Sequence, residues 1–350
     1  MIANLREHKN RIEWIDFAKG LTIILTIIGH TVGADRNGSN LRGIIFSFHM
    51  PLFFVLSATT YKFSVNFSDF IRKTKKAAYH LLLPATAIFF LNFLIQSILN
   101  KCSLLDCWLW RDIIYTYLFG SGVPTQFDYI YVPQMGIPWF FFALFAGRTI
   151  FDYLHLYFAQ TGQLFVMTIV VGCCGISFGK LQWLPFSLDI ALAIMPLFFF
   201  GMQLHTVDIV GNIKMACTFL IIWMITLKIT FPDYNSWTYL ELACRRYPLF
   251  PMCYVTAIFG ILFIAEISIM CKKIKPIFSI VSFVGKNSLY LLCVHIMDGC
   301  WWKAYTMDGQ FRMAAKRTVV DLSVFIVVLL VIKAYQMIKM KLVAVQINNK

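Results

Sequence analysis

Residues 14–33 read WIDFAKGLTIILTIIGHTVG, and this stretch decides the class of fold. A transmembrane α-helix needs about 20 mostly apolar residues to cross the hydrocarbon core of a bilayer, and the stretch has that length. Three ionisable residues interrupt it, namely Asp16, Lys19 and His30. Ionisable side chains inside a membrane are costly and usually line a site or a water-filled cavity. The stretch therefore predicts a membrane-spanning helix with a polar, functional face.

The composition of the whole chain agrees with a membrane protein. Of its 350 residues, 59% are hydrophobic and 14% are charged, and the mean hydropathy is +0.71. Soluble domains carry about 25% charged residues, so the composition excludes a soluble enzyme, a disordered regulator and a disulfide-stabilised mini-protein. The apolar runs predict spans at roughly 14–33, 44–62, 79–100, 138–158, 164–180, 186–204, 212–230, 247–270, 278–299 and 318–340. We expect an all-α integral membrane protein in which residues 1–350 form a single bundle of about ten transmembrane helices.

The distribution of Lys and Arg predicts the orientation of this bundle. Basic residues are more frequent in the loops on the side of the N-terminus, above all in 63–78 and 271–277. Because cytoplasmic loops carry the excess of Lys and Arg, both termini are expected in the cytoplasm. The net charge of +14 comes from such short clusters and not from one basic face, which excludes nucleic acid as a partner. We expect a multi-pass protein of a cell membrane, the cytoplasmic membrane in a bacterium, with the lipid bilayer as partner and a homo-oligomer as an option.

The longest connection between predicted spans, 101–137, is rich in Trp and Tyr. These amphipathic rings favour the depth of the lipid headgroups, so the segment is expected to lie at the membrane interface. It also contains Cys102 and Cys107, which could pair if the segment faces an oxidising compartment. Most other cysteines lie in apolar runs, where they act as small hydrophobic residues, and the sequence lacks the cysteine spacing of a zinc site.

Lys19 and His30 are predicted to share one face of the first helix. From Lys19 to His30 the helix rotates to within about 20° of a whole number of turns, and it rises about 16 Å along its axis. Asp16 falls within about 40° of the same line. The alternative interpretation is a structural ion pair between Asp16 and Lys19, with an unrelated histidine at the membrane interface.

Two more histidines are predicted at the depth of His30. His49 begins the second span, which enters from the outer side, and His295 lies near the outer end of the ninth span, close to Asp298. An imidazole titrates near neutral pH and can take a proton from a hydroxyl, as a general base does. The three histidines are therefore a candidate catalytic site. Each one alone is equally well explained as a hydrogen-bonded residue of the bundle, and their spacing does not indicate a metal site.

Additional cations are candidates for binding an anionic ligand. Arg148 lies in the middle of the fourth span, shortly after Trp139, where a guanidinium needs a carboxylate, phosphate or carbonyl partner. Structural pairing and ligand contact both remain open for it. A basic cluster also precedes the third span, and it consists of Arg72, Lys73, Lys75 and Lys76. This cluster is either a topology anchor or a binding site for an anionic cytoplasmic ligand such as a nucleotide diphosphate.

The order of these motifs resembles the acyltransferase-3 family, and within it the fucose-4-O-acetylase-like branch of polysaccharide O-acetyltransferases. The resemblance begins with RIEWIDFAKG at 11–20, then His30, then FSFHMPLFFVLS at 46–57. It continues with the basic cluster ahead of Pro84, PWFFFALF at 138–145 and GKNSLYLLCVH at 285–295. Lys19 stands where much of the family has arginine, and Ala58 stands where glycine is usual.

The resemblance implies transfer of an acyl group, most often acetyl, from acyl-CoA on the cytoplasmic side to a hydroxyl of a carbohydrate or lipid-linked glycan precursor. Acyl-CoA would be a co-substrate, and no cofactor would stay bound. His30 would be the base, with His49 and His295 assisting it. The binding residues would be Lys19, Arg148, Arg72, Lys73, Lys75 and Lys76 for CoA, and Asp16, Trp139 and Asp298 for the substrate. Lys19, Arg148 or helical Ser and Thr side chains are the alternatives for stabilising the oxyanion.

Two other functions are compatible with polar residues inside the membrane. One is a transporter or flippase for a lipid-linked sugar, and the other is a structural or regulatory protein that binds lipid headgroups. Transporters commonly contain internal repeats, whereas the hydropathy of this chain shows none. The polar residues concentrate on the first, second and ninth spans. An O-acyltransferase is therefore the favoured prediction.

Overall fold

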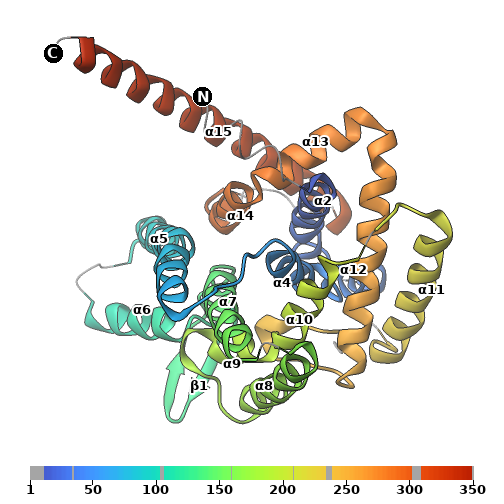
Figure 1. Ribbon diagram of the computed structural model, residues 1–350. Helices are drawn as coiled ribbons and strands as arrows, with labels where there is room; N and C mark the ends of the chain where they lie inside the picture. The colour runs from blue at the N-terminus through green and yellow to red at the C-terminus, as the bar shows by residue number, and fades with distance from the viewer. Residues whose placement is uncertain are drawn as a thin grey trace.

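The computed structural model describes residues 12–33, 35–102, 106–158, 160–207, 209–233, 239–301 and 309–348. These residues form a helical bundle with one small hairpin (Figure 1). The elements of the first half are α2 (Glu13–Gly29), α3 (Arg36–Phe46), α4 (His49–Thr59), α5 (Phe67–Leu99), α6 (Cys107–Phe119), β1 (Thr125–Phe127), β2 (Ile130–Val132) and α7 (Trp139–Tyr157). Those of the second half are α8 (Thr161–Leu181), α9 (Leu188–Ala193), α10 (Met195–Leu204), α11 (Ile213–Thr230), α12 (Met252–Met270), α13 (Lys275–Lys286), α14 (Ser288–Met297) and α15 (Gln310–Asn348), with short 3-10 turns at Pro185–Ser187, Leu242–Cys244, Cys271–Lys273 and Asp298–Cys300.

The described helices confirm an all-α fold with several candidate membrane spans. Within the described ranges, six helical stretches are long and apolar enough to cross a membrane. The number rises to eight if each of two bent helix pairs forms one span, namely α9 with α10 and α13 with α14. Helix α2, at 17 residues, and helix α7, which carries Arg148 and Asp152, are not among them.

The structure corrects the extent of the third predicted span. Helix α5 begins at Phe67, twelve residues earlier than its apolar run, so the basic cluster lies on a helix and not in a loop. The Asn66 side chain caps this helix by accepting a hydrogen bond of 2.9 Å from the backbone N–H of Asp69. Lys and Arg lower hydropathy but are good helix formers. Hydropathy therefore located the membrane-crossing part and missed the polar extension.

Three other predicted spans contain breaks. The run 44–62 is divided between α3 and α4, with Phe48 in a non-helical conformation at the junction. Pro196 follows the break between α9 and α10, which are bent by 55°. The pair α13–α14 is bent by 68° next to Asn287. Helices α4 and α14, which follow two of these breaks, carry His49 and His295.

Helix α2 lies inside the bundle and contacts α3, α4, α12, α13, α14 and α15. Its tightest contact is with α13, where two glycines allow the backbones to touch. A Cβ atom on Gly20 would lie 2.0 Å from the carbonyl oxygen of Val281, and one on Gly285 would lie 1.7 Å from the carbonyl oxygen of Asp16. Small residues permit this kind of close helix packing in membranes. The helix that carries Lys19 and His30 is thus fixed against its neighbour.

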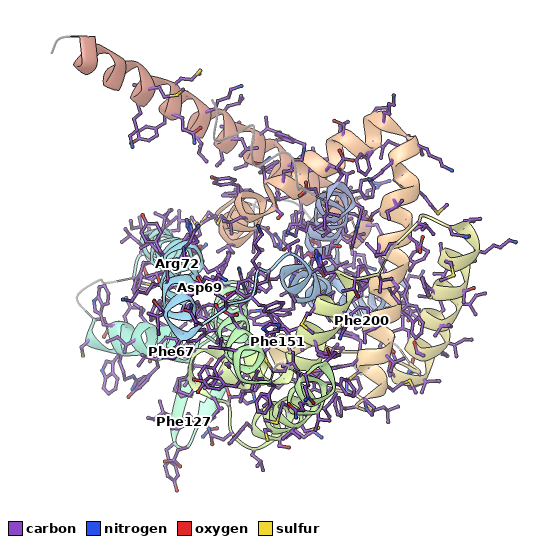
Figure 2. All side chains as sticks on the ribbon, in the orientation of Figure 1. Phe67, Asp69, Arg72, Phe127, Phe151 and Phe200 are labelled. Atoms are coloured by element: carbon purple, nitrogen blue, oxygen red, sulfur yellow. The ribbon has the colours of Figure 1, made fainter. Side chains whose placement is uncertain are left out.

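Aromatic rings fill the core between α4, α7 and α10. Phe54 has its ring centroid 5.1 Å from that of Phe140 and 6.2 Å from that of Phe198. Phe151, labelled near the centre of Figure 2, packs 5.7 Å from Phe198. Aromatic pairs at these separations contribute about 0.5–1.5 kcal/mol each beyond the area they bury. This packing gives the site described below a rigid floor.

The aromatic-rich connection folds into helix α6 and the β1–β2 hairpin. Tyr129 at the hairpin is 92% exposed and Trp108 on α6 is 64% exposed, which is compatible with the predicted interfacial position. Cys102 and Cys107 are both free thiols. Figure 1 shows this unit at the edge of the bundle, far from the long projecting helix α15.

Candidate active site

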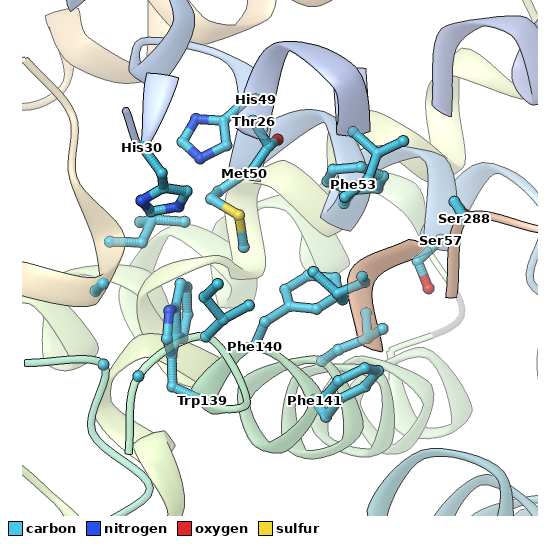
Figure 3. Close-up of a pocket in the computed structure, with 18 of the residues that line it drawn as sticks. Thr26, His30, His49, Met50, Phe53, Ser57, Trp139, Phe140, Phe141 and Ser288 are labelled. Carbon is cyan, nitrogen blue, oxygen red and sulfur yellow. The ribbon is translucent and has the colours of Figure 1, made fainter. Parts of the chain in front are cut away.

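A cavity of about 530 Å³ follows one side of helix α2. Lys19 and His30, which the sequence placed on one helix face, both line it. Since they are about 16 Å apart along the helix, they mark its two ends. Figure 3 shows His30 and His49 at one end and Ser57 and Ser288 toward the other. This volume is within the usual range for small-molecule sites.

Three histidines meet at the first end of the cavity. The ring centroid of His30 lies 5.5 Å from that of His295 and 6.4 Å from that of His49. His30 is exposed and His49 is buried, and both line the cavity. His295 is only 1% exposed and lies behind them. The sequence predicted that these rings reach one level, and the structure brings them together.

A buried charged cluster holds His295 from behind. Its Nδ1 lies 2.8 Å from Oδ2 of Asp298 and 3.3 Å from Oδ2 of Asp321. Arg317 donates to both oxygens of Asp298, at 2.7 and 3.0 Å, and to the Thr31 hydroxyl at 3.1 Å. Carboxylates on one ring nitrogen place the proton there. Within the described part of the chain, Nε2 of His295 has no hydrogen-bond partner, so it is the nitrogen left for chemistry.

The same cluster has the ligand types of a metal site. Ligand atoms of His295, Asp298 and Asp321 lie within 4.8 Å of one another. However, the guanidinium of Arg317 already occupies both oxygens of Asp298. A bound arginine supplies the positive charge that a metal ion would bring, so the donor set does not fit a resident metal well.

Cations also line the second end of the cavity. Lys19 and Arg148 both belong to the wall there. The guanidinium of Arg148 lies 4.6 Å from the ring centroid of Tyr61, and its Nε has no hydrogen-bond partner among the described residues. The neighbouring carboxylate of Asp152 instead accepts hydrogen bonds from the Tyr61 hydroxyl at 2.9 Å and from Ser64. Arg148 therefore retains donors for an anionic ligand.

The wall between the two ends is mostly apolar. Ile23, Phe53 and Phe140 lie along the middle, and Trp139 lies nearer the histidine end. In Figure 3, Met50, Phe53, Phe140 and Phe141 surround this middle section. The cavity thus joins a cationic end to a histidine end through an apolar passage, which suits an elongated ligand with a charged head.

Other predicted site residues lie elsewhere. Asp16 is buried where α2 meets α13, and Asp298 is buried behind His295, so neither lines the cavity. The basic cluster lies at the start of α5, with Arg72 labelled in Figure 2. Lys73 is engaged by Asp69 at 2.8 Å and by the carbonyl oxygens of Lys62 and Phe63. Arg72 also pairs with Asp69, and Arg72, Lys75 and Lys76 are all exposed.

Sequence reasoning missed Asp321, Arg317 and Arg42. Asp321 is fully buried in helix α15, and Arg317 lies one turn before it. The spacing of the two by four residues in an apolar run was a signal that they share a helix face. Arg42 lines the histidine end of the cavity from α3, a region that the sequence had assigned to a loop.

The described residues thus form a helical bundle with several candidate membrane spans and a cavity that joins a cationic end to a histidine end. The family model described as an acyltransferase domain matches residues 12–334, so the chain belongs to this acyltransferase family and is a membrane acyltransferase. No curated protein and no solved structure matches it.

Proposed function

We propose that this acyltransferase moves an acetyl group from acetyl-CoA to a hydroxyl of a carbohydrate, as a member of the fucose-4-O-acetylase-like branch. The observation that carries the proposal is the cavity along α2, which has Lys19 and Arg148 at one end and His30 and His49, beside the pair Arg42 and Glu241, at the other. A CoA thioester has a charged head, a long arm and a reactive end. This order matches the order of residue types along the cavity.

The cationic end is proposed to hold the head of the donor. Lys19 and Arg148 provide positive charge inside the cavity, and Arg72, Lys75 and Lys76 provide more on the exposed surface of α5. Charge-assisted hydrogen bonds of Lys and Arg to phosphate are about twice as strong as neutral ones. Because Lys19 lies about 16 Å from His30, it belongs to donor binding and not to the oxyanion.

The histidine end is proposed to perform the chemistry. His30 takes the proton of the acceptor hydroxyl, and the oxygen attacks the thioester carbonyl to give a tetrahedral oxyanion. This intermediate collapses with cleavage of the C–S bond, and the departing thiolate receives the proton from His30. The products are the acetyl ester and free CoA. His49, which also lines the cavity, is proposed to orient the reacting groups.

His295 is proposed to support the proton transfer at His30. Its Nδ1 is held by Asp298 and Asp321, so a proton taken up at Nε2 gives an imidazolium flanked by two carboxylates. The same principle stabilises the imidazolium in hydrolases that contain a histidine and a carboxylate. Asp298 and Asp321 are positioning residues in this proposal, since they contact His295 and not the cavity.

The proposed topology has ten spans and both termini in the cytoplasm of a bacterium. Helices α2 and α7 would be the two spans beyond the eight that length and composition identify. A bundle interior shields polar residues of such helices from lipid. This orientation puts Lys19 on the side where acetyl-CoA is made and His30 toward the outer side.

The competing function is a transporter for a lipid-linked sugar, because a polar cavity is also what a transporter needs. Membranes that contain the protein, incubated with acetyl-CoA labelled in the acetyl group, should transfer label to the glycan fraction. Mass spectrometry of surface glycans from cells with and without the gene should show a mass difference of one acetyl group. Movement of glycan without any acetylation would favour the transporter.

A further inference from the structure

A pair of oppositely charged residues lines the histidine end of the cavity. Arg42 on α3 and Glu241 in the loop before α12 both belong to its wall. Nη2 of Arg42 lies 3.7 Å from Oε1 of Glu241, and their side chains are 20% and 12% exposed. The proposed chemistry at His30 uses neither residue. A guanidinium and a carboxylate therefore stand side by side at the reactive end with no role assigned.

Arg42 is held in place by two aromatic residues. Its Nε donates a hydrogen bond of 2.9 Å to the hydroxyl of Tyr239, and its guanidinium lies 4.4 Å from the ring centroid of Phe46. Phe46 also packs 4.4 Å from His49. The guanidinium is consequently fixed in orientation relative to the histidines, and this preorganisation is what a specific binding site needs.

The loop that carries Glu241 is equally well fixed. Backbone N–H groups of Glu241 and Arg246 each donate to the carbonyl of the other at 3.1 Å. Next to them, Arg245 is buried and binds Asp189 of α9 at 2.7 and 3.1 Å. A buried bidentate pair of this kind gives strong geometric restraint. Arg245 faces the core, whereas Glu241 lines the cavity.

An aromatic face lies on the same part of the wall. Trp139 lines the cavity, and a Cβ atom added to Gly122 would lie 2.6 Å from its Cδ1 and 2.9 Å from Cβ of Ala243. The loops around Gly122 and Ala243 therefore pack directly against the indole. Figure 3 shows the Trp139 ring below His30. The end thus combines the Glu241 carboxylate, the Arg42 guanidinium and an apolar plane, and Nη1 of Arg246 lies 3.4 Å from the other carboxylate oxygen of Glu241.

We propose that Arg42, Glu241 and Trp139 form the acceptor subsite, and that it takes one sugar unit through two neighbouring hydroxyls; this inference rests on the proposed function. A sugar hydroxyl is both a donor and an acceptor. One hydroxyl donates to the Glu241 carboxylate, a neighbouring hydroxyl accepts from the Arg42 guanidinium, and the C–H face of the ring packs on Trp139.

The test is binding of simple glycosides to the purified full-length protein in detergent, without acyl-CoA. The probes are neutral methyl hexosides, and their binding is followed by ligand-detected NMR or tryptophan fluorescence. The wild type should bind at least one neutral hexoside with a measurable Kd. Glu241→Gln should raise the Kd of that hexoside about tenfold, because it loses a hydrogen bond to a charged group. Asp112→Asn, which removes an exposed carboxylate that pairs with Arg111 on α6, is the matched control and should bind as the wild type does.

Two results would overturn the subsite: no neutral hexoside binds to folded wild type, or Glu241→Gln binds as the control does. If Glu241→Gln does not fold, Arg42→Lys replaces it and should show the same loss. CoA release is then measured separately with acetyl-CoA and the bound hexoside. If binding depends on Glu241 but no CoA is released, the subsite is retained and the proposed acetyl transfer is contradicted. If the glycoside is acetylated but its binding does not depend on Glu241, the acetyl transfer is retained and the subsite is contradicted.

Discussion

Replacing His30 by alanine should separate catalysis from stability. The ring is exposed to the cavity, and its nearest aromatic neighbours are Phe46 at 5.2 Å and His295 at 5.5 Å between centroids. Its loss leaves no buried carboxylate without a partner, so folding should change little. A positioned general base contributes about 100-fold to 10,000-fold in rate, which is about 2.7–5.5 kcal/mol of transition-state free energy.

The assay is release of free thiol from acetyl-CoA by the purified protein in the presence of an acceptor. For His30→Ala, kcat and kcat/KM should fall together, because a base acts in the transition state and not in ground-state binding. In the wild type, activity should fall as the pH is lowered through the titration of His30, since a protonated ring cannot accept the hydroxyl proton. His205→Ala, at the exposed end of α10, is the matched control.

His295→Ala should behave differently from His30→Ala. Removal of this buried ring leaves Asp298 and Asp321 without their shared partner, at a cost of about 1–3 kcal/mol in folding free energy. The thermal unfolding of both variants is therefore measured together with their kinetics. The reasoning is refuted if folded His30→Ala keeps most of its turnover, and His295 then becomes the next candidate for the base.

Three more perturbations test the rest of the structure. Changing Arg72, Lys75 and Lys76 to Gln should raise KM for acetyl-CoA and weaken its salt dependence, as measured by initial rates at two salt concentrations; an unchanged KM would mean that the cluster only anchors topology. Arg317→Leu should lower the free energy of unfolding by about 3–5 kcal/mol because it breaks a buried ion pair, whereas Arg111→Leu at an exposed pair should cost at most about 1 kcal/mol in the same denaturation assay. In a variant with Cys102 and Cys107 changed to Ser, an impermeant thiol reagent added to intact cells should label Asn40→Cys and spare Ser68→Cys, and the opposite pattern would reverse the proposed orientation.

Hydropathy and helical periodicity predicted much of this fold, because they report directly on how a helix partitions its side chains. The positions of α8 and α11 follow their apolar runs closely. The common face of Lys19 and His30 follows from the helix pitch alone. The polar start of α5 and the break at Phe48 could not be predicted this way, since both depend on capping and local backbone geometry.

The candidate site was only partly predictable for a related reason. Sequence spacing places residues on one helix, but it does not say which helices pack together. The meeting of His30, His49 and His295 was expected from their depth, whereas the placement of Asp321 behind His295 depends on how α14 contacts α15. Asp298 was expected among the substrate-binding residues, whereas its hydrogen bonds to His295 and Arg317 hold it behind the histidine.

The contact between Gly20 and α13 has a consequence for donor selection. Lys19 is next to that contact, and α2 continues without a break from there to its end at Gly29. Lys19 can therefore not slide toward His30 unless the two backbones separate. A donor whose head is held at Lys19 presents its acyl group to His30 only if the connecting arm is about 16 Å long. Under the proposed binding of the donor, the rigid helix would thus favour thioesters with long arms over those with short arms.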